Sequence, residues 1–277
     1  MILKCEIWSI ANQKGGVGKT TTTFNLGVAL AMAGKRVLLV DADPQADLTT
    51  YMGWHDADNI PITLATLMER SMRYEDINPE SAILHHDEGL DLIPSNLDLS
   101  STEVSLVNAM SREYTIKSCL EPLKNKYDYI LIDCMPSLGW ITINALATSS
   151  KVIIPVQSEF LAAKGMSHLM QSVMRIRKTI NKDLKVGGIL LTMTDYRTNL
   201  AKDISNELKE TYGTVFKLFD TQIPRGIKAA ESSRQGESIL SYDKNSKVAQ
   251  SYISFAKEVL NNEREEKTRH SDSIQVR

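Results

Sequence analysis

The chain of 277 residues lacks any hydrophobic run long enough to cross a bilayer. Its longest apolar stretches, such as "RVLLV" (36–40) and "VIIPV" (152–156), have the length of a strand, whereas a membrane helix needs about 20 apolar residues. The N-terminal segment "MILKCEIWSIANQ" runs directly into a glycine-rich loop, which leaves no room for a cleavable signal. We therefore expect a cytoplasmic protein with no membrane partner.

Cysteine is also scarce. The three cysteines, Cys5, Cys119 and Cys134, form no C-x-x-C pair, so neither a disulfide framework nor a zinc site is expected. We predict that all three are small buried apolar residues. The stretch "HHDE" (85–88) contains metal-ligand residue types, but no matching cluster lies elsewhere in the sequence. We predict a solvated loop there.

The formal charge of −2 gives no strong excess of either sign, yet it hides an uneven distribution. Residues 221–257 hold six basic side chains against three acidic ones, which gives this region a charge of +3. A locally basic region can be a face that binds a polyanion. The other interpretation, an ordinary solvated surface, remains open.

Strand-like apolar runs alternate with helical patterns along the chain. Nearly continuous hydrophobic runs are typical of strands that are buried on both faces of a parallel sheet. In the helical segment 161–180, Met166 and Met170 fall on the apolar face and are predicted core residues. We expect strands at 6–11, 36–43, 90–95, 127–133, 151–156 and 186–192, and helices at 20–34 and 161–180.

This alternation predicts an α/β fold, with a doubly wound, mostly parallel sheet flanked by helices. Residues 1–260 are expected to form a single domain. Residues 261–277 are charged and lack apolar periodicity. We expect them to be a frayed, exposed tail.

A phosphate-binding loop lies between the first strand and the first helix. Gly18-Lys19-Thr20 fits the end of the P-loop pattern G-x-x-x-x-G-K-[ST], but Gln13 stands where the first glycine is required and Lys14 lies beside it. We expect Lys19 against the β- and γ-phosphates and the Thr20 hydroxyl on Mg²⁺. The predicted nucleotide-binding residues of the loop are Lys14, Gly15, Gly16, Val17, Gly18, Lys19, Thr20 and Thr21.

Carboxylates follow two of the predicted strands. Asp133 ends "YDYILID", and Asp41 and Asp43 end "RVLLVDAD". Ligands of open α/β sheets bind outside the carboxyl ends of the strands. We expect Asp133 to hold Mg²⁺ through its water shell, and Asp43 to orient the attacking water or to touch the metal shell. A structural role for Asp41 is equally open.

The motifs "KGGVGKTT", "VDADPQ" and "DYILIDCMPSLG" together resemble the deviant Walker A ATPases, and most closely the ParA/Soj group of partitioning ATPases. The likeness covers nearly the whole chain and is to the small type, which has no N-terminal helix-turn-helix. It implies a weak, partner-stimulated ATPase that uses ATP and Mg²⁺ and forms a homodimer with ATP. Lys14 would reach the phosphates of the partner subunit, so that Lys14, Lys19 and Asp43 are the catalytic residues.

The resemblance also implies contacts outside the loop. Pro224 and Arg225 lie in "IPRG", where the family has "IPRN", and are expected near the nucleotide. The implied partners are nonspecific double-stranded DNA and a ParB-like centromere-binding protein, which would make the protein nucleoid-associated. The expected DNA-binding residues are Arg197, Arg225, Lys228, Lys244 and Lys247.

Two alternatives remain open at this point. Arg197 could instead pair locally with Asp195 or Asp203. The chain could also be a nucleotide-dependent regulatory or positioning switch, MinD-like or associated with conjugation, that acts on a protein complex with little DNA transport.

Overall fold

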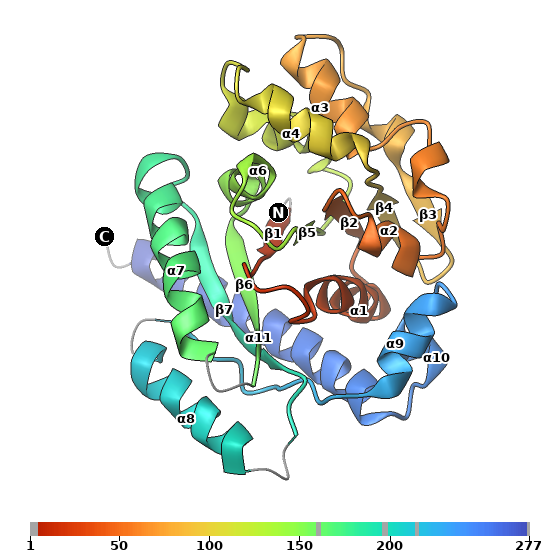
Figure 1. Cartoon of the computed structure of the whole chain (residues 1–277). Helices are drawn as coiled ribbons and strands as arrows, with labels where there is room; N and C mark the ends of the chain where they lie inside the picture. The colour runs from red at the N-terminus through yellow and green to blue at the C-terminus, as the bar shows by residue number, and fades with distance from the viewer. Residues whose placement is uncertain (1–4, 159–161, 196–198, 214–215, 276–277) are drawn as a thin grey trace.

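The computed structural model describes residues 5–158, 162–195, 199–213 and 216–275. Its helices pack around a single sheet (Figure 1). Within these residues, seven strands lie in the order β3-β4-β2-β5-β1-β6-β7. All neighbours pair in parallel except β3 and β4, which form an antiparallel hairpin. The strands are β1 (Glu6–Ile10), β2 (Val37–Ala42), β3 (Leu84–His86), β4 (Leu90–Ile93), β5 (Tyr129–Cys134), β6 (Lys151–Gln157) and β7 (Lys185–Thr192).

Helices cover both faces of the sheet, and each face has its own hydrophobic core. The first face carries α1 (Lys19–Met32), α2 (Asp47–Tyr51), α9 (Ile227–Arg234), α10 (Ile239–Tyr242) and α11 (Lys247–Gln275). The second carries α3 (Leu64–Met72), α4 (Asp98–Leu106), α5 (Thr115–Leu120), α6 (Trp140–Thr148), α7 (Ala162–Thr179) and α8 (Asn199–Tyr212). Short 3-10 helices occupy Ala57–Asn59, Pro79–Ala82, Arg112–Tyr114 and Glu121–Leu123. The predicted doubly wound α/β fold is confirmed.

The continuous hydrophobic runs became central strands because both of their faces are covered. Every residue of β2 and of β5 is buried. Parallel pairing places Asp41 of β2 and Ile10 of β1 in register with Asp133 of β5. The residues that end these three strands therefore meet at one edge of the sheet, at the start of the phosphate-binding loop.

Other core predictions are also confirmed. Met166 and Met170 of α7 are buried in the second core, and all three cysteines are buried free thiols. Burial raises the pKa of the Cys119 thiol to about 12, so this group is a neutral apolar side chain at physiological pH.

The stretch "HHDE" differs from the predicted solvated loop. His86 ends β3, and its Nε2 lies 3.1 Å from the Gly236 carbonyl oxygen. Glu88 accepts hydrogen bonds from the backbone N–H and the hydroxyl of Ser238, at the start of α10. These residues connect the hairpin to the loop after α9. Among the described residues, no group of three or more His, Cys, Asp or Glu side chains is placed to hold a metal.

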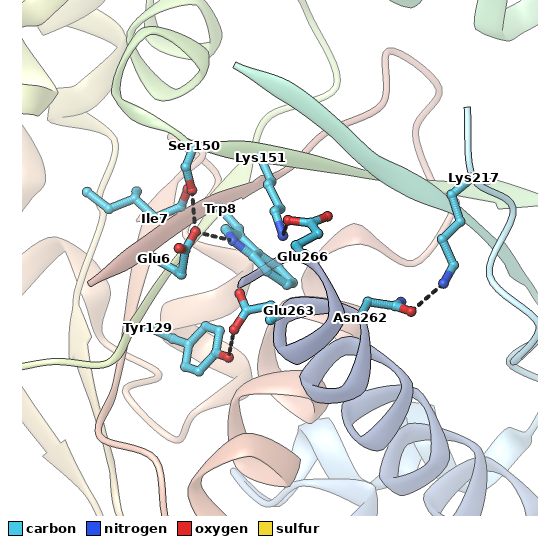
Figure 2. A network of polar contacts seen from close by, with 10 residues as sticks. All are labelled: Glu6, Ile7, Trp8, Tyr129, Ser150, Lys151, Lys217, Asn262, Glu263 and Glu266. Carbon is cyan, nitrogen blue, oxygen red and sulfur yellow. Dashed lines mark hydrogen bonds and ion pairs between the residues drawn. The ribbon is translucent and has the colours of Figure 1, made fainter. Parts of the chain in front are cut away.

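The segment after Leu260 also differs from the frayed tail that the sequence predicts, because α11 continues to Gln275. Figure 2 shows how this part of the helix contacts the sheet. The Tyr129 hydroxyl donates to Glu263 Oε2 over 2.5 Å, and Lys151 Nζ lies 2.9 Å from Glu266 Oε2. Polar side chains make these contacts, so the sequence contains no apolar periodicity that would predict them.

Candidate nucleotide-binding site

The loop between β1 and α1 has the backbone of a phosphate-binding turn. Gly16 and Gly18 adopt positive φ angles of 71° and 81°, a conformation that side chains disfavour. Gly18 is the N-cap of α1 and no side chain caps this helix, so its first N–H groups and its dipole face the loop. The Thr192 hydroxyl donates to the Val17 carbonyl over 2.8 Å and ties the loop to β7.

The two lysines of the loop have opposite surroundings. Lys19 is only 8% exposed, and its Nζ lies 3.5 Å from the Lys14 carbonyl oxygen. Lys14 is exposed, although its backbone N–H donates to Asn12 Oδ1 over 3.0 Å. Asn12 is itself held by the Pro155 carbonyl at 2.7 Å. The fold thus fixes the backbone of Lys14 while its side chain lies at the surface, beside a loop whose other lysine is buried.

Asp133 lies under this loop, 1% exposed, and accepts a hydrogen bond from Thr23 Oγ1 over 3.3 Å. Burial is the main cause that raises its pKa well above the usual range, and the neighbouring Asp41 charge adds to it. A hydrogen bond with the Thr20 side chain and the Lys19 charge act in the opposite direction. A positive charge bound beside Asp133 would therefore relieve an unfavourable burial.

Asp41 is fully buried and accepts hydrogen bonds from α2. Its Oδ2 accepts from the backbone N–H and the hydroxyl of Thr49 over 2.9 and 2.7 Å, and its Oδ1 accepts from the Asp43 N–H over 3.2 Å. Burial raises the pKa of Asp41 to about 7. These contacts favour the structural role of Asp41, which joins the end of β2 to α2.

Asp43 is less buried than Asp41 and lies between β2 and α2. Its Oδ1 accepts from the Gln45 N–H over 3.0 Å. Together, the Thr20 hydroxyl and the carboxylates of Asp43 and Asp133 offer hard oxygen ligands of the kind that Mg²⁺ takes in phosphate sites. The donor chemistry of the site thus fits this ion.

A cavity of about 420 Å³ adjoins the loop. Gly18 and Thr21 line it on the side of the loop, and Pro224 and Arg225 line another wall, so the structure brings together these four predicted residues. Tyr51 and Ser233 also line it and were not predicted. The sequence offered little signal for them, because Tyr51 lies eight residues after Asp43 and Ser233 falls in a stretch without a motif.

The predicted DNA-binding residues are only partly described. Arg225, Lys244 and Lys247 are exposed, and they lie on the neighbouring segments that begin α9 and α11. Lys228 of α9 forms an ion pair with Asp243 at 2.7 Å, which offsets its charge locally. Arg197 lies outside the described residues.

Comparison with known proteins decides the family. A family model described as an AAA domain matches residues 5–186. The sporulation initiation inhibitor protein Soj of Bacillus subtilis (strain 168) is 44% identical over 257 residues, which cover 93% of this chain and 99% of Soj. The chain belongs to the ParA/Soj family. The chromosome partitioning protein ParA of Caulobacter vibrioides (strain NA1000 / CB15N) is 37% identical over 267 residues, which cover 94% of this chain and 96% of that protein.

A solved structure has the same fold. The cobyrinic acid a,c-diamide synthase from Mycobacterium smegmatis, crystallised with ADP and magnesium, superimposes with a TM-score of 0.82 at 35% sequence identity. The match covers 94% of this ParA/Soj-family chain and 96% of the other. The family resemblance and the P-loop ATPase fold predicted from the motifs are both confirmed. Among the described residues, no helix is both long and apolar enough to span a membrane.

Proposed function

We propose that the protein is an ATP-dependent DNA-segregation ATPase that forms an ATP-bound homodimer and converts ATP and water to ADP and phosphate. The contrast between buried Lys19 and exposed Lys14 in one loop carries this proposal. Lys19 would bind the phosphates of its own subunit. Lys14 is at the surface, where a residue that acts on the phosphates of a second subunit must lie.

The substrate would bind with its phosphates at the loop and its nucleoside in the adjoining cavity. The N–H groups at the start of α1 and the Lys19 ammonium would hold the phosphates, and Pro224 and Arg225 would contact the nucleoside. Thr20, Asp43 and Asp133 would hold Mg²⁺, which neutralises negative charge on the phosphate oxygens when bound. Asp43 would orient the attacking water.

Lys14 would place a positive charge where negative charge develops during phosphoryl transfer in the partner subunit. Hydrolysis and dimer formation are then linked, because each active site is incomplete without the second copy. A monomer would bind nucleotide but hydrolyse it weakly, and a ParB-like partner would stimulate the dimer.

The proposal includes DNA binding by the dimer, which is supported by the family and by the exposed cations Arg225, Lys244 and Lys247, with Arg197 and Lys228 as further candidates. Each neutralised phosphate releases counterions, so affinity should fall steeply with salt and depend little on sequence. Dimerisation would double the contacts. The protein would accordingly be nucleoid-associated.

The test is binding to random-sequence duplex DNA with ATP, with ADP, and with Arg197→Glu or Lys247→Glu variants in ATP. We expect tight binding only for the unmodified protein with ATP. Comparable affinity in all states would reject DNA segregation and would favour the alternative, a regulatory or positioning switch that acts on a protein complex.

A further inference from the structure

Tyr51 lies where the nucleotide cavity meets the segment that carries Asp43. Its side chain lines the cavity of about 420 Å³ together with Gly18 and Pro224, although it belongs to α2, the helix that follows Asp43 in the chain. Ser233 of α9 is another residue of the cavity wall. One short helix is thus both a wall of the cavity and the continuation of the Asp43 segment.

Contacts on both sides fix α2 in this position. At one side, Thr49 binds Asp41 through its backbone N–H and its hydroxyl. At the other, the chain after α2 packs against the loop after α9, where a Cβ atom at Gly236 would lie 2.8 Å from Gly53 Cα. Such close packing leaves no empty space between the chain after α2 and the loop after α9. A ligand that contacts Tyr51 would therefore act on a helix that is tied to Asp41 at one side and to the loop after α9 at the other.

We propose that Tyr51 contacts the nucleoside of the bound nucleotide and couples occupation of the cavity to the position of the Asp43 segment. This inference rests on the proposed nucleotide site. Ile223, Ala229 and Val248 also line the cavity, and such an apolar lining suits a flat purine. Because Tyr51 is placed to touch the nucleoside rather than the reacting phosphate, it is a positioning residue.

The test compares ADP with inorganic pyrophosphate, which offers phosphates to the loop but has no nucleoside. Both are titrated with Mg²⁺ by calorimetry, so neither hydrolysis nor an ATP dimer is involved. Tyr51→Ala should weaken ADP binding by about tenfold, as expected for loss of a contact between a base and an aromatic ring. The affinity for pyrophosphate should be unchanged. Tyr51→Phe keeps the ring and should lose less of the ADP affinity. Tyr74→Ala, at a tyrosine that is 78% exposed, is the control and should change neither.

Amide hydrogen exchange over residues 47–51 tests the coupling. ADP should slow exchange there in the unmodified protein, pyrophosphate should do so much less, and the ADP effect should disappear in Tyr51→Ala. Pyrophosphate binding also reports that the loop of each variant is intact. Equal weakening of both ligands, unchanged ADP affinity, or retained ADP protection in Tyr51→Ala would overturn this inference alone. An unmodified protein that binds neither ligand would overturn the proposed function together with it.

Discussion

Tyr129→Phe tests the contact between the sheet and the C-terminal half of α11. The substitution removes only the hydroxyl that donates to Glu263 Oε2 over 2.5 Å, and Glu263 is just 6% exposed. Hydrogen bonds to charged groups contribute about 1.5–3 kcal/mol, and water cannot easily replace a donor at a buried site. We therefore expect the free energy of unfolding to fall by about 1.5–3 kcal/mol.

The assay is urea unfolding at pH 7, supported by thermal melting, in which each kcal/mol should lower Tm by about 2–4 °C. Tyr74→Phe, at an exposed tyrosine, is the matched control and should stay within about 0.5 kcal/mol of the unmodified protein. Tyr129→Phe and Glu263→Gln should also be non-additive, since both change the same bond. A Tyr129→Phe variant no less stable than the control would refute the reasoning.

The same pair makes a pH prediction. Burial, and then the Glu263 charge, raises the pKa of Tyr129 above its ordinary value of 10.0. Above pH 10 the unfolded state therefore releases a proton that the folded state keeps, so stability falls as pH rises. Phenylalanine has no such proton. The stability difference between Tyr129→Phe and the unmodified protein should narrow above pH 10.

The remaining predictions concern the loop, the carboxylate and a backbone contact. Lys19→Ala should lose nucleotide binding, whereas Lys14→Ala should bind ATP but should neither dimerise nor hydrolyse it. Calorimetry measures the binding, light scattering the dimer, and phosphate release the hydrolysis. Equal loss of ATP binding in both variants would contradict a role of Lys14 in the partner's site. Asp43→Ala should trap an ATP-bound dimer, and phosphate release at the parental rate would remove Asp43 from the mechanism. Gly236→Ala should lower the free energy of unfolding in urea more than Gly34→Ala does. Both residues have φ near 75°, which should cost each variant about 1–2 kcal/mol, but of the two only a Cβ at position 236 meets backbone within 3 Å. Equal losses of stability would show that the close contact relaxes.

The sheet could be predicted from the sequence because its central strands are buried on both faces and so appear as continuous apolar runs. The loop could be predicted because phosphate binding needs glycine and lysine at fixed spacing. Asp133 and Asp43 could be predicted because each follows an apolar run that reads as a strand, and ligands bind at the carboxyl ends of such strands. These features depend on residues that are close together in the chain.

The contacts that escaped prediction join distant segments through polar groups. Glu88 accepts hydrogen bonds from Ser238, and Glu263 accepts one from Tyr129. None of these has a period or a motif, because a hydrogen bond needs only one suitable atom on each side. The charge count of the basic region likewise gave no indication that Lys228 pairs with Asp243.

The position of α11 has a consequence for the order in which the protein can fold during synthesis. Phe255 and Tyr252 of α11 complete the core on the face that holds α1, and the Tyr252 hydroxyl lies 3.3 Å from Thr22 Oγ1, three residues after Lys19. A ribosome makes the loop well before this helix. Until α11 has emerged, the helix that presents the phosphate-binding loop lacks its main cover. Nascent chains should therefore expose apolar surface around α1 until α11 has emerged, and should complete this core only then.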